Sequence, residues 1–216
     1  MATQRDVHLF VVDTLADWEP GLAIAHINHP APGGPSRYVV KTVGLSRAPV
    51  HTRGGMTIIP DLALAEVSPA DSALLILPGS DLCADKRTDP ALALARGFVD
   101  AGVPVAAICG ATLGLARAGL LDHRRHTGND PDWLATSGYQ GRALYVREPA
   151  VEDRGIITAS ATAPVDFARL ILARLAVFTP ATLEAWFGLF KTHDPACFFA
   201  FMKGVEKDGL APQQPA

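Results

Sequence analysis

Residues 103–112 read Val-Pro-Val-Ala-Ala-Ile-Cys-Gly-Ala-Thr, and the residues that follow have the composition of a helix. The short apolar side chains from Val103 to Ile108 are typical of a central strand in a parallel sheet, because both faces of such a strand are covered. Cys109 then lies at the carboxyl end of the strand, on a sharp turn into the helix. Ligands bind at this edge of open α/β sheets, so we expect the side chain of Cys109 to project into a crevice.

The surroundings of Cys109 predict a reactive thiol. Ala107 and Ala111, two positions away on either side, are as small as a sharp strand-to-helix turn requires. The helix directs its unpaired N–H groups and the positive end of its dipole at the sulfur, which favours thiolate over thiol. We therefore expect Cys109 to be a nucleophile; the alternative is a buried structural cysteine that ends a strand.

Composition narrows the class of protein. The chain has 216 residues, of which 49% are hydrophobic and 19% charged, enough for one large α/β core. We expect a single domain over residues 1–210 and a disordered tail at 211–216. The formal net charge of −3 offers no basic surface for phosphate backbones, so a small molecule is expected as partner rather than a nucleic acid.

Location and cofactors can be predicted from the same sequence. No apolar run approaches the length of a membrane span, and the first residues do not form a signal peptide, so we expect a cytoplasmic protein without a membrane partner. The free thiols Cys83, Cys109 and Cys197 form no C-x-x-C pair, which fits a reducing compartment. The chain has seven histidines, but their spacing along the sequence does not predict a metal site. We therefore expect neither a metal nor a cofactor.

Strands alternate with helices along the chain. Strands are expected at residues 7–12, 38–43, 56–60, 73–77, 103–108, 143–146 and 155–159. Helices are expected at residues 21–28, 62–66, 90–101 and 113–118, and from Pro164, Pro180 and Pro195 onward. This order predicts a three-layer α/β sandwich on a mostly parallel sheet. The aromatic residues near the C-terminus are expected to pack in the core or, alternatively, to form a dimer interface: Trp186, Phe187, Phe190, Phe198, Phe199 and Phe201.

Three turns of this fold share the carboxyl edge of the sheet. They carry Glu19, then Gly79 and Ser80, then Cys109 and Gly110, so a carboxyl group, backbone N–H groups and a thiol should converge. An ionised Glu19 raises the pKa of a nearby thiol, whereas a protonated one can donate a hydrogen bond to thiolate. The site therefore requires burial to raise the Glu19 pKa; the alternative is that Glu19 only complements the dipole of its helix.

The motifs on these turns resemble those of a known family. In order, they are Asp17-Trp18-Glu19, Leu77-Pro78-Gly79-Ser80, Ala107-Ile108-Cys109-Gly110-Ala111-Thr112 and Thr158-Ala159-Ser160-Ala161-Thr162-Ala163-Pro164. Together they resemble the PfpI/DJ-1 family of the class I glutamine amidotransferase-like superfamily over nearly the whole chain. The resemblance implies a flavodoxin-like fold and a reactive Cys109 with Glu19 as its carboxylic partner. For the assembly we expect a homodimer.

The resemblance also implies further site residues. The N–H groups of Gly79 or Ser80 and of Gly110 would bind an oxyanion. His126 lies in the loop where family members place a histidine facing the thiol, as base or proton shuttle; the alternative is a solvated loop histidine. Trp18 and Thr162 are candidate walls of the pocket.

Two departures from the family separate this chain from its better-known activities. Protease-like members carry a histidine directly after the nucleophile, where this chain has Gly110, and the stretch 159–166 lacks the His-x-Glu pair of glutamine amidotransferases. Two hypotheses follow. The chain is a cysteine-dependent enzyme of hydrolase, hydratase or glyoxalase type, acting on a small carbonyl, amide or isonitrile. Alternatively, it is a redox-sensing or stress-protective protein that uses oxidation of Cys109. An interaction domain with an unreactive Cys109 is a third possibility.

Overall fold

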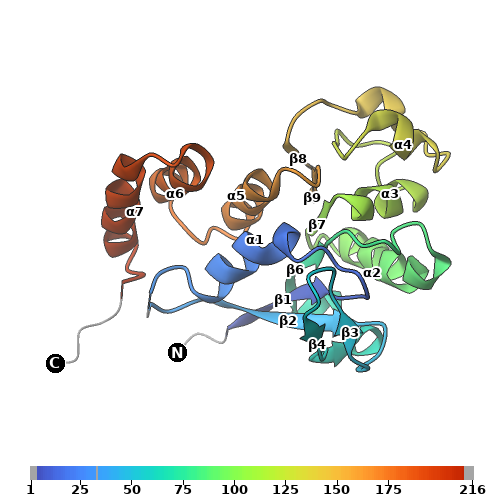
Figure 1. Ribbon diagram of the computed structural model, residues 1–216, viewed down its shortest axis with the longest axis horizontal. Coiled ribbons are helices and arrows are strands. Elements are labelled where there is room, and N and C mark those ends of the chain that lie inside the picture. Colours follow the sequence, from blue (N-terminus) through green and yellow to red (C-terminus); the bar gives the residue numbers. More distant parts are fainter. Residues whose placement is uncertain (1–3, 33, 212–216) are drawn as a thin grey trace.

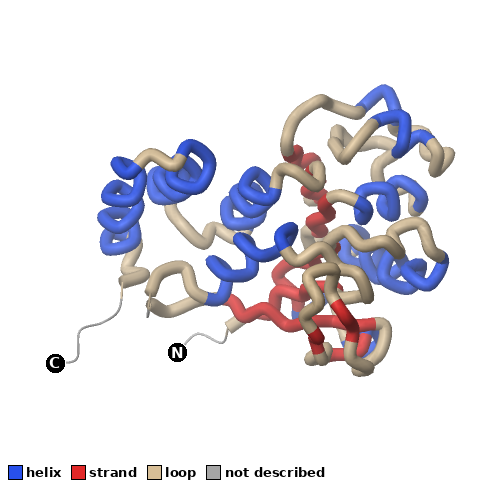
Figure 2. The backbone as a smooth tube through the Cα atoms, in the orientation of Figure 1, coloured by secondary structure: helices blue, strands red, loops and turns tan. Residues whose placement is uncertain are grey.

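The computed structural model describes residues 4–32 and 34–211, arranged around a seven-stranded sheet (Figures 1 and 2). The strand order is β5-β2-β1-β6-β7-β9-β8. Every neighbouring pair is parallel except β8 and β9, which are antiparallel. The strands are β1 Arg5–Phe10, β2 Tyr38–Gly44, β5 Leu62–Ala63, β6 Ser72–Leu77, β7 Val105–Ile108, β8 Ala150–Asp153 and β9 Ile156–Ala159. The predicted α/β fold with a mostly parallel sheet is confirmed.

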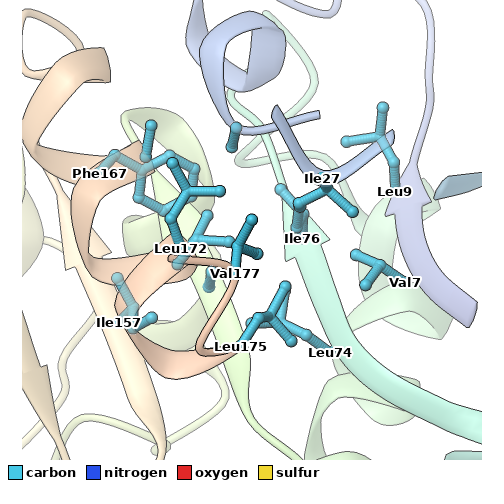
Figure 3. Packing of buried hydrophobic residues seen from close by; sticks show 14 of the residues in the cluster. Val7, Leu9, Ile27, Leu74, Ile76, Ile157, Phe167, Leu172, Leu175 and Val177 are labelled. Atoms are coloured by element: carbon cyan, nitrogen blue, oxygen red, sulfur yellow. The ribbon is translucent and has the colours of Figure 1, made fainter. Parts of the chain in front are cut away.

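Helices cover both faces of the sheet (Figure 1). They are α1 Trp18–Asn28, α2 Asp89–Asp100, α3 Gly110–Arg117, α4 Pro131–Ala135, α5 Pro164–Arg174, α6 Pro180–Thr192 and α7 Pro195–Lys207. Side chains alternate between the two layers along each strand, since the strand period is two. Leu74 and Ile76 of β6 pack with the layer of α1 and α5 (Figure 3), whereas Leu75 and Leu77 pack with that of α2 and α3. Both layers therefore have an apolar core, and β6 and β7 are buried between them.

The second half of the sheet differs from the prediction. Residues 143–146 were expected to form a strand, but Arg142–Leu144 is a 3-10 helix and the antiparallel edge strand is β8. β8 joins β9 through a tight turn at Arg154 and Gly155, whose φ angles are 47° and 81°. An antiparallel edge strand needs only one buried face, so it lacks the continuous apolar run that the prediction relied on.

The short elements near residue 60 also differ in part. The stretch 56–60 contains β4, Thr57–Ile58, which pairs with β3, Val50–His51, in a separate antiparallel ribbon. The helix expected at 62–66 is instead β5 followed by a single 3-10 turn at Leu64–Glu66. Because β5 pairs with β2, sheet pairing prevails over local helix propensity there.

Helices α6 and α7 pack together at one end of the molecule, beside α5 (Figure 1). Trp186 and Phe201 are buried between these helices and the core, as the packing hypothesis predicts, while Phe198 and Phe199 of α7 are exposed. No helix in the described part of the chain is long and apolar enough to cross a membrane. Most of the tail predicted at 211–216 lies outside the described residues.

Candidate active site

Cys109 lies on a strained turn between β7 and α3. Its φ and ψ angles are 58° and −125°, a conformation that costs a side-chain-bearing residue about 1–3 kcal/mol. Hydrogen bonds on both sides hold it there. The Cys109 N–H donates to Ala159 O at 3.0 Å, and its carbonyl accepts from Thr112 N at 3.1 Å and Oγ1 at 2.6 Å. The predicted sharp turn is present, and it points the thiol away from the strand.

Glu19 lies in the first turn of α1, fully buried. Its Oε2 atom accepts a hydrogen bond of 2.6 Å from Gly79 N–H, while Oε1 is buried without a hydrogen-bond partner among the described residues. Burial raises the pKa of Glu19, although the hydrogen bonds with Gly79 and Cys109 oppose the shift. The sequence-based requirement that burial raise the Glu19 pKa is thus confirmed.

Gly79 brings the carboxyl group and the thiol together. A Cβ atom on Gly79 would lie 3.0 Å from Cys109 Sγ and 3.0 Å from Glu19 Oε2, so the two groups share the space that a side chain would fill. The N–H of Gly79 was one of the expected oxyanion donors, but it is committed to Glu19. Ser80 and Gly110 therefore remain as the candidate donors for an oxyanion.

The thiol of Cys109 is less acidic than the sequence predicts. Burial raises its pKa to about 11, and the negative charge of Glu19 adds to the shift, whereas hydrogen bonds from Asn129 and Gly110 oppose it. Burial of the thiol, with the charge of Glu19 added, therefore outweighs the donors at the start of α3. A protonated Glu19 lacks that charge, so the titration of the thiol is coupled to that of the carboxyl group.

His126 does not face the thiol. Its ring is buried, with Nδ1 2.8 Å from the carbonyl oxygen of Arg124 and Nε2 2.9 Å from the hydroxyl of Tyr139. Nδ1 must donate to the carbonyl, so Nε2 accepts from Tyr139. Burial also lowers the His126 pKa. Both expectations for this residue, the proton shuttle and the solvated loop histidine, are therefore wrong, because its two nitrogens bind groups that pin the loop in place.

Asn129, three residues farther along the same loop, contacts the sulfur instead. Its Nδ2 donates to Cys109 Sγ at 3.3 Å, and its Oδ1 accepts from Ala161 N at 2.8 Å. Sequence analysis missed this residue, because no motif distinguishes an asparagine that turns into a site from one in an ordinary loop. Trp18, a predicted wall, is half-exposed and donates from Nε1 to Ala161 O at 3.2 Å. Thr162 is exposed beside it and bonds Ser160.

The space next to Gly110 is filled by Cys83. A Cβ atom at position 110 would lie 2.7 Å from Cys83 Cβ and 2.8 Å from Cys83 Sγ. Only glycine fits this position without a shift of the neighbouring loop. A histidine directly after Cys109 is therefore excluded by packing as well as by sequence.

Comparison with known proteins identifies the family of the chain. A family model described as the DJ-1/PfpI family matches residues 5–174, which contain every site residue named above. The chain belongs to the DJ-1/PfpI family. The predicted resemblance is thus confirmed.

Relatives of known sequence and structure cover nearly the whole chain. YoaZ of Bacillus subtilis, named an uncharacterized protease, is 39% identical over an alignment of 213 residues that covers 94% of this chain and 99% of YoaZ. YdeA of the same organism, also named an uncharacterized protease, is 31% identical over 81% of this chain and 85% of its own. The solved thiJ/pfpI family protein of Bacillus anthracis has a TM-score of 0.89 and 37% identity, covering 94% of this chain and 98% of its own. A DJ-1 superfamily protein of Agrobacterium tumefaciens has a TM-score of 0.76 and 30% identity, covering 88% and 99%.

Metal ligands do not gather at the site. In residues 4–32 and 34–211, no three or more histidine, cysteine or acidic side chains are grouped so that they could hold a metal ion.

Proposed function

We propose that the protein is a cysteine-dependent enzyme in which Cys109 adds to the electrophilic carbon of a small carbonyl, amide or related substrate. The observation that carries the proposal is the buried carboxyl group of Glu19, which meets the thiol across Gly79. Burying a carboxyl group lowers the stability of the fold, and buried titratable groups with shifted pKa values are typical of functional sites. Here it is placed where it can take the thiol proton.

The proposed step moves one proton and forms one bond. The thiol proton passes to the Glu19 carboxylate as the sulfur attacks, the C–S bond forms, and the π electron pair of the substrate moves onto its oxygen or nitrogen. The N–H groups of Ser80 and Gly110 are the candidate donors for the resulting anion. Glu19 then returns the proton to that atom. Because burial raises the Glu19 pKa, its proton affinity is closer to that of the thiol, which makes the transfer less unfavourable.

The names of the relatives support a hydrolytic reaction, since YoaZ and YdeA are both named proteases. The hydratase and glyoxalase types stay in the proposal because they begin with the same addition.

A substrate panel tests the proposal. Wild type, Cys109→Ser and Cys197→Ser are assayed with glyoxals, small amides and isonitriles, and separately titrated with hydrogen peroxide. Cys197 is a free cysteine on α7 and serves as the matched control. We expect turnover by wild type and Cys197→Ser and none by Cys109→Ser. Selective oxidation of Cys109 without turnover of any compound would refute the enzyme and favour the sensor.

A homodimer remains our proposal for the assembly. The exposed Phe198 and Phe199 on α7 are the candidates from the aromatic segment for such an interface. Sedimentation of wild type and Phe199→Glu tests it, since a change from dimer to monomer is expected only if this surface forms the contact.

A further inference from the structure

The geometry points to Asn129 as a further catalytic residue, whose amide NH2 group holds the Cys109 sulfur as negative charge develops on it. This inference rests on the function proposed above. Asn129 Nδ2 lies 3.3 Å from Sγ, within reach for a hydrogen bond to sulfur. A donor to an anionic acceptor forms a stronger bond than one to a neutral acceptor, so this contact strengthens when the thiol loses its proton.

The orientation of the Asn129 amide is fixed by its other contact. The Ala161 N–H can only donate, so the amide atom 2.8 Å from it must be the oxygen. The NH2 group therefore faces the sulfur, and a flipped amide would set two donors against each other. An amide held in this way is ready to donate before substrate arrives.

Ala161 is itself held in place from the opposite side. Its carbonyl oxygen accepts from Trp18 Nε1 at 3.2 Å, and Trp18 directly precedes Glu19 in α1. The hydrogen bonds of Asn129, Ala161 and Trp18 thus connect the loop before α4, the loop between β9 and α5, and the start of α1. The donor to the sulfur and the acceptor of its proton are consequently positioned by one connected set of contacts.

A neutral donor has a chemical consequence. A side-chain amide neither takes nor gives up a proton near neutral pH. The ring nitrogens of His126, the nearby titratable group in the same loop, are bound to Arg124 and Tyr139. Asn129 therefore stabilises the sulfur anion without adding an ionisation of its own. It acts both when the thiol is deprotonated for attack and when the sulfur leaves as the covalent intermediate breaks down.

The experiment uses the reactivity of Cys109 itself, which requires no known substrate. The pH dependence of Cys109 alkylation by iodoacetamide is measured for wild type, Asn129→Ala, Asn129→Asp and the control Asp132→Asn. Asp132 is exposed on neighbouring α4 and pairs with Arg142. Asn129→Asp keeps an oxygen for Ala161 N–H and so preserves the loop, while it replaces the donor with an acceptor.

We expect Asn129→Ala to raise the thiol pKa by about 1 unit, since a hydrogen bond to a charged group has about this strength. Asn129→Asp is expected to raise it further, and Asp132→Asn to leave it unchanged. With any substrate found, kcat should fall about 10- to 100-fold in Asn129→Ala. A thiol pKa in Asn129→Ala equal to or below that of wild type would overturn the inference. Failure of the proposed function shows separately, as absence of turnover by wild type.

Discussion

The change of Glu19 to glutamine separates thiol acidity from catalysis. Glutamine has the shape of glutamate, and its oxygen can still accept the hydrogen bond from Gly79 N–H. It has no negative charge and cannot accept a proton. We therefore expect the Cys109 thiol to become more acidic in Glu19→Gln, while turnover by the proposed mechanism is lost.

The size of the shift follows from the position of Gly79. Cys109 Sγ and Glu19 Oε2 each lie 3.0 Å from the point that a Gly79 Cβ would occupy, so at most about 6 Å separates them. Two unit charges about 6 Å apart repel by about 3 kcal/mol at an effective dielectric constant of about 20, which corresponds to about 2 pKa units. Burial of the thiol, the larger cause of its raised pKa of about 11, remains in the variant. The expected fall is therefore about 1–2 units.

The assay is the pH dependence of alkylation, quantified by mass spectrometry on the peptide that contains Cys109. At neutral pH the variant should be alkylated about 10- to 100-fold faster than wild type, because the thiolate fraction rises tenfold for each pKa unit. A thiol pKa at or above that of wild type would refute the reasoning, since it would mean that wild-type Glu19 is protonated and donates to thiolate. Persistent turnover would refute its role in proton transfer.

Three further results are expected. Gly110→Ala should destabilise the fold by about 1–3 kcal/mol through overpacking against Cys83. Adding Cys83→Gly to this variant should recover part of the loss. If Gly110→Ala were equally destabilising with Cys83 and with glycine at position 83, the packing of these two residues would be contradicted. Tyr139→Phe should lower the free energy of unfolding by about 1–3 kcal/mol, because it leaves Nε2 of the buried His126 without a donor. The Cys109 pKa should not change in this variant, and a shift would contradict the conclusion that His126 is separate from the site. The folded-state pKa of Glu19 is raised, so its stabilising contribution is present below its unfolded pKa and is lost as pH rises through the folded value. The urea midpoint of Glu19→Gln, measured as a function of pH, should lack this decline. If wild type and variant showed the same pH dependence of the midpoint, the raised pKa of Glu19 would be contradicted.

The convergence of Glu19, Gly79 and Cys109 could be predicted because it depends on strand order alone. The strands β1, β6 and β7 are apolar runs that signal burial, and their carboxyl ends meet at one edge in any doubly wound sheet. The small residues around Cys109 likewise indicated the turn that the structure contains. Local pattern and global topology agree at these positions, so sequence reasoning succeeded there.

The choice between His126 and Asn129 could not be predicted, because it depends on contacts distant in sequence. Tyr139 and the carbonyl of Arg124 turn the histidine inward, and Ala161 turns the asparagine toward the sulfur. A loop sequence shows which residues are available but not which of them rotates into a site. The same limit applies to the N–H of Gly79, whose acceptor is a side chain sixty residues earlier.

These packing details bear on which groups move protons at the site. Cys83 fills the space that a histidine after Cys109 would need, and both ring nitrogens of His126 are bound to groups other than the thiol. In the proposed mechanism, proton transfer then falls to Glu19, which takes the thiol proton and returns it. Addition to a carbonyl places that proton on the substrate oxygen and leaves a covalent C–S adduct, and the cycle closes only when the C–S bond breaks and the sulfur takes the proton back through Glu19. Peptide hydrolysis needs, in addition, a base that activates water against the acyl intermediate. In the proposed mechanism, Glu19 supplies that base only after giving its proton to the departing amine, so both proton transfers of a hydrolysis fall to one carboxyl group in sequence.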